Sequence, residues 1–329
     1  MKISIEKKLL SLNYPWKISR NTSYQKTNFI VCMEQDGKTG LGEVAPNIRY
    51  DETPERIMQE FKQLDQNKFT NVLPPIDDFT HWLNQYNLSQ SFRFGLESAF
   101  IHLFCETENI NVCDFLGTEP INETDTCFSI PIMEPENLEK FFIQWKLDRF
   151  KALKLKINKE SGIELVNKLS QLTKQSLRID ANESFTSFEN CMEFIDKLHP
   201  YNIQFIEQPL SSNLSDDYKM LRKNCPYSLF ADESITNEMN VELISEQFNG
   251  INMKLMKAGG YLNGIKILKS ARHFNLETMI GCMVETSLGI YSALNLVSLA
   301  DYIDLDGFLV VKDEPFGFVT ERNGRIYRK

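Results

Sequence analysis

The sequence predicts an α/β fold in which a parallel barrel follows an N-terminal α+β region. Short apolar runs recur from residue 127 onward, with starts 22–26 residues apart, and amphipathic helix-like segments separate them. Repeated strand–helix units imply parallel strands with right-handed crossovers. Eight units favour a closed barrel over an open doubly wound sheet. The eight runs are 127–132, 152–157, 177–179, 203–206, 228–231, 250–253, 276–280 and 302–309.

The first part of the chain has a different residue pattern, typical of an antiparallel meander. The turn Asp36-Gly37 separates two alternating segments, which is a hairpin signature. Apolar residues at helical spacing follow further along the chain. The predicted strands are 3–12, 28–34 and 39–43, and the predicted helices are 53–68 and 90–106.

Composition excludes several classes of protein. The 329 residues carry a net charge of −9 without a long basic run, so we expect neither nucleic acid nor an anionic membrane as partner. No segment reaches 18 apolar residues, which predicts no membrane span. Lys7 and Lys8 interrupt the short N-terminal apolar stretch, so we expect no signal peptide. Seven scattered cysteines without a CxxC pair indicate reduced thiols in a cytoplasmic protein.

Carboxylates follow three consecutive predicted strands. Asp180, Glu207 and Asp232 each stand where a strand meets its loop. The C-terminal strand ends of a barrel meet at one mouth, so these groups should converge there. Converging carboxylates repel one another without a cation, and hard oxygen ligands suit Mg²⁺. A single carboxylate at such a position is more often a solvated strand end or a helix cap. The prediction of a metal site depends on the occurrence of carboxylates at the ends of three consecutive strands.

Lysines end the second and sixth predicted strands. Lys156 and Lys254 should face each other, because strands 2 and 6 lie opposite in an eight-stranded barrel. With a substrate carboxylate on the metal, one neutral lysine can take the α-proton while the opposite ammonium returns one to the other face. Lys154 shares the strand face of Lys156 and should lower its pKa. Strand parity points Lys257 to the outer face, where it would cover the start of a helix.

Five motifs together resemble the enolase superfamily, in its muconate-lactonizing-enzyme subgroup. They are KLK at 154–156, DAN at 180–182, IEQP at 206–209, DES at 232–234 and KLMKAGG at 254–260, and GLGEVAP at 40–46 is similar to a family segment at the site edge. The resemblance implies a (β/α)7β TIM-like barrel over 123–309. It implies an α+β capping domain over 1–122, completed by a C-terminal tail, 310–329. It also implies a homo-oligomer.

The same resemblance assigns roles to the site residues. Asp180, Glu207 and Asp232 would bind Mg²⁺, and Lys156 and Lys254 would be the acid/base pair, with Lys154 as tuning group. Such enzymes use a Lys or His base beside Mg²⁺.

The reaction within the subgroup depends on the eighth strand. Asp304 and Asp306 resemble a DxD pair that holds the substrate α-ammonium in dipeptide epimerases, and two carboxylates on one face suit a cationic amine. Met283, on the seventh strand, looks like a further substrate contact. We therefore expect inversion of the α-carbon of a dipeptide's C-terminal residue by two-base 1,1-proton transfer through an enolate.

The dipeptide and the competing functions remain open at this point. Arg20 would grip an acidic side chain, as in Ala-Glu epimerases that recycle cell-wall peptides, and the loop at Tyr50 would close over the substrate. On the same site, o-succinylbenzoate synthase or N-acylamino-acid racemase activity is the alternative. Two further alternatives belong to different functional classes: a metal-independent Schiff-base aldolase and a non-catalytic barrel that binds a small molecule.

Overall fold

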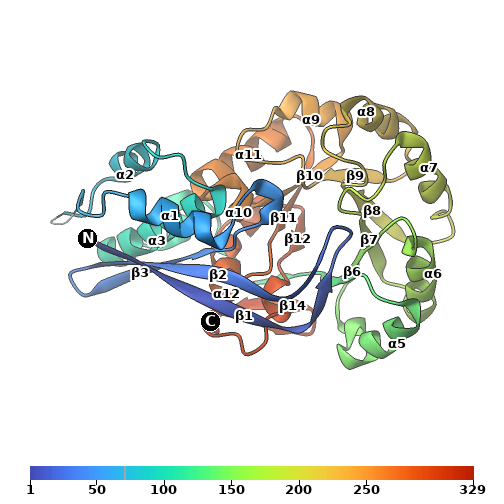
Figure 1. Ribbon diagram of the computed structural model, residues 1–329, viewed down its shortest axis with the longest axis horizontal. Helices are drawn as coiled ribbons and strands as arrows, with labels where there is room; N and C mark the ends of the chain where they lie inside the picture. Colours follow the sequence, from blue (N-terminus) through green and yellow to red (C-terminus); the bar gives the residue numbers. More distant parts are fainter. Residues whose placement is uncertain (70–71) are drawn as a thin grey trace.

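An eight-stranded parallel sheet, rolled into a nearly closed barrel, forms the centre of the computed structural model, which describes residues 1–69 and 72–329 (Figure 1). The strands follow one another in chain order around the sheet, from β5 to β12. This arrangement confirms the predicted fold class. The barrel strands are β5 (Phe128–Ile130), β6 (Ala152–Lys156), β7 (Ser176–Asp180), β8 (Ile203–Glu207), β9 (Ser228–Ala231), β10 (Gly250–Lys254), β11 (Glu277–Gly281) and β12 (Tyr302–Asp304).

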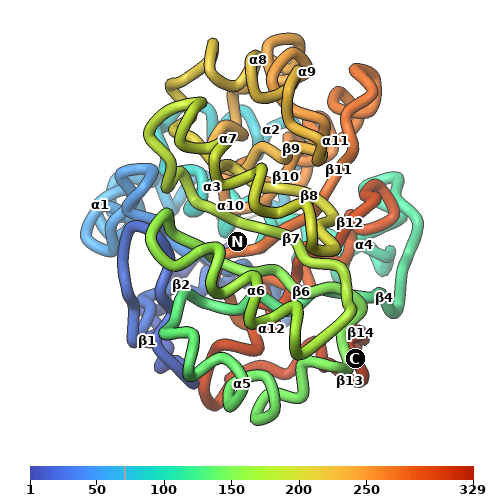
Figure 2. The backbone as a smooth tube through the Cα atoms, turned by 90° about the vertical axis from the view of Figure 1, so that its right-hand side faces the viewer, coloured from blue at the N-terminus to red at the C-terminus, as the bar shows by residue number. Residues whose placement is uncertain are grey.

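Helices between the strands cover the outside of the barrel (Figures 1 and 2). Their apolar faces pack on the strands, as in α6, where Leu165, Val166 and Leu169 are fully buried. These helices are α5 (Pro135–Gln144), α6 (Gly162–Leu172), α7 (Phe188–Asp196), α8 (Ser215–Asn224), α9 (Val241–Gln247), α10 (Leu255–Ala258), α11 (Tyr261–His273) and α12 (Ser287–Leu294), with short 3₁₀ turns η2 (Leu147–Arg149), η3 (Val297–Leu299) and η4 (Gly307–Leu309).

The two edge strands of the sheet, β5 and β12, do not pair with each other through their backbones. Hydrogen bonds that involve side chains bridge this seam instead. The backbone N–H of Ser129 donates to Asp306 Oδ2 at 2.5 Å, and the backbone N–H of Leu305 donates to Thr126 Oγ1 at 3.0 Å. The eighth predicted run is therefore shorter as a strand than expected. It ends at Asp304, and its remaining part turns into η4.

The N-terminal region folds as an antiparallel sheet covered by helices. The sheet has the order β1-β2-β3, and glycines in β3 allow it to lie directly on α3: a Cβ on Gly42 would stand 2.0 Å from the backbone oxygen of Gly95. The elements are β1 (Lys2–Lys17), β2 (Thr22–Gln35), β3 (Lys38–Val44), η1 (Ile48–Tyr50), α1 (Pro54–Gln63), α2 (Ile76–Leu83), α3 (Gln90–Glu108) and α4 (Val112–Leu116). β1 and β2 run longer than predicted, and β1 contains a register shift between Ser11 and Trp16.

A buried carboxylate fixes this N-terminal sheet to the barrel. Glu43, in β3, accepts hydrogen bonds from the backbone N–H groups of Thr286 and Gly289, both at 2.9 Å, at the start of α12. It also accepts from Asn28 Nδ2 at 2.8 Å. A helix N-terminus is a favourable place for a carboxylate because its first N–H groups lack intrahelical partners. The contact therefore sets how the N-terminal sheet lies over the barrel mouth.

The C-terminal tail contacts both parts of the molecule. Val311 forms a bridge to Leu12 of β1. Further on, β13 (Val319–Arg322) pairs with β14 (Arg325–Arg328), which in turn pairs with β4 (Glu123–Asp125) just before the barrel. The division at residues 122 and 309 stays a prediction. All seven cysteines are unpaired. Among the described helices, none has the length and apolar character that crossing a membrane requires.

Candidate active site

Three carboxylates meet at the C-terminal ends of β7, β8 and β9. Asp180 and Glu207 are the last residues of their strands, and Asp232 follows the last residue of β9. One oxygen from each lies within 4.8 Å of the others, and all three side chains are buried. Consecutive parallel strands place their ends side by side, which is why residues so far apart in the chain converge.

Lysine ammonium groups surround this cluster. Lys154 Nζ lies 2.9 Å from Asp180 Oδ2, 2.8 Å from Glu207 Oε2 and 2.8 Å from Asp304 Oδ2. Lys156 Nζ reaches Asp180 Oδ2 at 2.5 Å, and Lys254 Nζ reaches Asp232 Oδ2 at 2.8 Å. Buried charges require such partners, because an unpaired ion in a low-dielectric interior is costly.

The lysines do not fully compensate the negative charge. Burial and the neighbouring Asp180 raise the pKa of Glu207 to about 7, although Lys154 acts to lower it. A divalent cation among the three carboxylates would supply the missing positive charge. The oxygen donors, their burial and their convergence all fit Mg²⁺, which favours carboxylate ligands. Asp180, Glu207 and Asp232 are thus the residues able to hold it.

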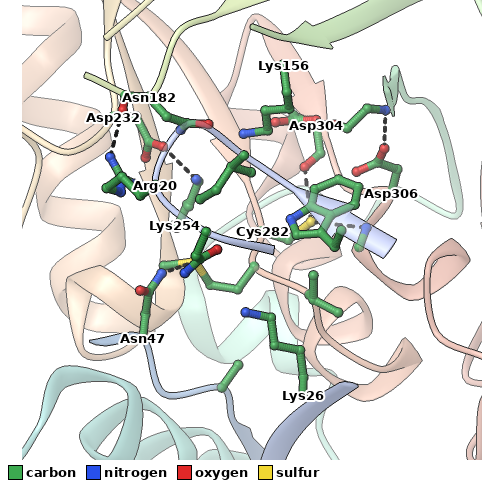
Figure 3. A pocket seen from close by; sticks show the side chains of 18 of the residues that line it. Arg20, Lys26, Asn47, Lys156, Asn182, Asp232, Lys254, Cys282, Asp304 and Asp306 are labelled. Carbon is green, nitrogen blue, oxygen red and sulfur yellow. Dashed lines mark hydrogen bonds and ion pairs between the residues drawn. The ribbon is translucent and has the colours of Figure 1, made fainter. Parts of the chain in front are cut away.

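Lys156 and Lys254 approach the cluster from different sides. Lys156 ends β6 and Lys254 ends β10, four positions apart in the strand order. Figure 3 shows the two side chains entering the same cavity from different directions. A carbon atom held between them would therefore be exposed to one amine on each face.

Lys257 corrects one expectation from the sequence. Its side chain is buried and its ammonium lies 2.6 Å from Asp232 Oδ1, instead of pointing to the outer face. It also donates to the backbone carbonyl of Asn252 at 3.3 Å. Strand parity fails here because β10 ends at Lys254 and the helix α10 begins at Leu255, so the next turn brings Lys257 back towards Asp232.

Asp304, the last residue of β12, and Asp306, just after this strand, lie on the opposite wall of the cavity from Asp232, next to Cys282 (Figure 3). Burial raises the pKa of Asp304, but Lys154 outweighs this effect and holds it below its ordinary value. Burial and Asp304 together raise the pKa of Asp306 to about 7. The neighbouring cations thus compensate the charge of ionised Asp306 only weakly, as expected of a group that receives a cationic ligand.

The three remaining predicted residues also line this cavity: Arg20, Tyr50 and Met283. The Arg20 guanidinium is already occupied, since it pairs with Glu233 Oε1 at 2.6 Å and Glu183 Oε2 at 3.1 Å. Burial raises the pKa of Tyr50 well above its ordinary value, and Asp232 and Glu233 add to this shift. The structure thus brings together every predicted site residue.

Four further residues belong to the site and were not predicted from the sequence: Glu183, Glu233, Asn252 and Lys26. Glu183 and Glu233 bind Arg20, and Glu183 also binds Arg49 Nε at 2.9 Å, so they attach two N-terminal loops to the barrel mouth. The signal for both was present, because they directly follow the DAN motif and Asp232. Asn252 donates to Glu207 Oε1 at 2.9 Å, and Lys26 lines the cavity from β2.

Comparison with known proteins agrees with this geometry. Residues 138–314 match the model of a family described as Enolase C-terminal domain-like. The chain belongs to the enolase superfamily. The match spans more than half of the chain and takes in the whole run of strand ends from β6 to β12.

Relatives in this superfamily resemble the chain over nearly its full length. It is 30% identical to an L-Ala-D/L-amino acid epimerase of Pedosphaera parvula, with 96% of this chain and 93% of the relative covered. It is 25% identical to an L-Ala-D/L-Glu epimerase of Bacteroides thetaiotaomicron, with 96% and 82% covered. The structure of a dipeptide epimerase from Cytophaga hutchinsonii, complexed with Mg and the dipeptide D-Ala-L-Val, superimposes with a TM-score of 0.92 at 25% identity, covering 99% and 92%.

Proposed function

We propose that this chain is a magnesium-dependent dipeptide epimerase that inverts the α-carbon of the C-terminal residue. The observation that carries the proposal is the pair Lys156 and Lys254, which enter one cavity from different strands beside three buried carboxylates. The named activities of the relatives, and the Mg and dipeptide bound in one of their structures, support it.

Each residue has a role in this reaction. Asp180, Glu207 and Asp232 hold Mg²⁺, which when bound withdraws electron density from the substrate carboxylate and so acidifies the α-carbon. Lys156 and Lys254 exchange the α-proton, one removing it from one face and the other delivering a proton to the opposite face. Proton removal and delivery on opposite faces invert the stereocentre.

The Asp304–Asp306 pair would bind the α-ammonium of the first residue. Asp306 is the better placed of the two, because Asp304 already pairs with Lys154 at 2.8 Å. This contact favours a dipeptide over an N-acylated amino acid or a dicarboxylate, neither of which carries an amine.

A dipeptide panel in D₂O with Mg²⁺ tests the proposed function. NMR should show loss of the α-proton of the second residue for L-Ala-L-Xaa substrates, together with appearance of the other diastereomer. Turnover of o-succinylbenzoate synthase substrate or racemisation of an N-acylamino acid, without exchange in any dipeptide, would replace the proposal by one of those activities.

A cytoplasmic homo-oligomer completes the proposal. Seven unpaired cysteines fit a reducing compartment, and the oligomeric state follows from the superfamily resemblance alone. Light scattering on the purified protein measures it directly. Turnover of cell-wall peptides would provide suitable substrates.

A further inference from the structure

One cation in the cavity wall stands apart from the others because its ammonium has no partner. The cavity is lined by five cationic side chains, and four of them are paired with carboxylates: Arg20, Lys154, Lys156 and Lys254. The fifth is Lys26. Within residues 1–69 and 72–329, no carboxylate forms an ion pair with Lys26 and no acceptor takes a hydrogen bond from its ammonium.

Lys26 is held in place by its strand. It lies on β2 with Leu10 of β1 as its Cα partner, and Leu10 packs with Val284 in a small apolar cluster. Figure 3 shows the Lys26 side chain directed into the cavity, on the side away from Lys156. Burial lowers the pKa of Lys26, and no carboxylate in the described part of the chain acts against this shift. A half-buried ammonium in this position lacks a counter-charge.

The neighbouring polar groups do not supply that charge. Asn28, two residues along the same strand, directs its amide nitrogen to Glu43 and to the carbonyl of Val284. Asn47 Nδ2 faces Met283 Sδ at 3.6 Å. These amides are neutral, and the apolar side chains of Met283 and Val284 line the same cavity. The surroundings therefore suit a short methylene chain that ends in a carboxylate.

We propose that Lys26 binds the side-chain carboxylate of an acidic residue at the epimerised position, so that this enzyme acts on dipeptides of the Ala-Glu and Ala-Asp type. The proposal rests on the proposed epimerase function. The α-carboxylate of the substrate belongs at the three-carboxylate site and the α-ammonium at Asp306. On the barrel side of the cavity Lys154 already pairs with Asp180 and Asp304, which leaves the side towards the N-terminal sheet, where Lys26 lies, for the side chain on the reacting carbon.

Arg20 is the competing cation for this role. Its two carboxylate partners satisfy its charge and hold the β1–β2 turn against the barrel, so binding a substrate carboxylate would require it to leave Glu183 or Glu233. Lys26 needs no such rearrangement. Lys26 therefore takes the substrate contact that the sequence predicted for Arg20, while Arg20 holds the β1–β2 turn against the barrel.

The test compares isosteric substrates in Lys26→Gln. We measure kcat/KM for L-Ala-L-Glu, L-Ala-L-Gln and L-Ala-L-Leu with Mg²⁺. The unmodified enzyme should prefer Glu over Gln, and K26Q should lower kcat/KM for Glu by about 10- to 100-fold, the range expected for a charge-assisted hydrogen bond. Its activity on Gln and Leu should change by less than about threefold. Lys26→Glu should shift the preference to L-Ala-L-Lys.

A matched control variant and two contrary results complete the test of Lys26. Lys17→Gln makes the same charge change in the same hairpin, at a residue that does not line the cavity, and should leave the Glu-to-Gln ratio unchanged. An equal loss on Glu and Gln in K26Q, or no preference for Glu in the unmodified enzyme, overturns the role of Lys26 while epimerisation itself stands. If no dipeptide is epimerised, the proposed function fails first.

Discussion

Lys156 and Lys254 each pair with a different outer member of the same carboxylate cluster. Lys156 Nζ lies 2.5 Å from Asp180 Oδ2, and Lys254 Nζ lies 2.8 Å from Asp232 Oδ2, with Glu207 on the strand between. The cluster thus positions the two amines as well as providing oxygen ligands. A cation bound by Asp180 and Asp232 would weaken both ion pairs and release the lysines for proton transfer.

Magnesium should stabilise the fold as well as support activity. Because the ligands converge only in the folded chain, Mg²⁺ about 100-fold above its Kd should add about 2.7 kcal/mol to the free energy of unfolding. Differential scanning calorimetry should show a Tm several degrees higher with Mg²⁺ than with EDTA. Asp232→Asn should reduce that shift. Full activity in EDTA with an unchanged Tm would support the metal-independent aldolase alternative.

Asp306 should determine whether the enzyme requires a free amine. We expect kcat/KM for L-Ala-L-Glu to exceed that for N-acetyl-L-Ala-L-Glu, and Asp306→Asn to reduce this ratio about tenfold or more, as loss of a charged hydrogen bond predicts. Asp304→Asn should also weaken substrate binding, more than it lowers stability. If the ratio of kcat/KM for the free and the acetylated dipeptide is the same in D306N and the unmodified enzyme, Asp306 does not bind the substrate amine. Its role would then be structural, through its hydrogen bond from Ser129 at the barrel seam.

His102 should make stability depend on pH. Burial lowers its pKa to about 4 from an ordinary 6.5, with Nδ1 donating to Leu41 O at 2.6 Å and Nε2 facing Tyr261 Oη at 2.9 Å. Between these values the unfolded chain binds more protons than the folded one. The contribution of neutral His102 is therefore complete above pH 6.5 and is lost as pH falls towards 4, by about 3 kcal/mol in all.

Urea unfolding at several pH values measures that contribution. The stability difference between the unmodified protein and His102→Gln should shrink as pH falls from 7 to 4.5. His273→Gln, at the exposed end of α11, serves as the control and should show no such trend. The same pH dependence in H102Q and the unmodified protein would show that His102 does not couple protons to folding.

Much of the site was predictable because barrel strands bring their C-terminal ends to one mouth. Asp180, Glu207 and Asp232 could thus be grouped from their order in the chain. Lys257 could not be placed, because a helix begins immediately after β10 and changes the direction of its side chain. Lys26 carries no local signal: it is one polar residue in a long hairpin, and only the packing of that hairpin on the barrel brings it to the cavity.

Isotope exchange in the two lysine variants tests the central claim most directly. With Mg²⁺ in D₂O, Lys156→Ala and Lys254→Ala should each lose epimerisation by about 10²-fold or more, the usual scale of general acid–base catalysis. Each should still exchange the α-proton of one diastereomer, and the two variants should act on opposite diastereomers. If both variants retain full epimerisation, or both exchange the same diastereomer, the two lysines do not act on opposite faces of the carbon.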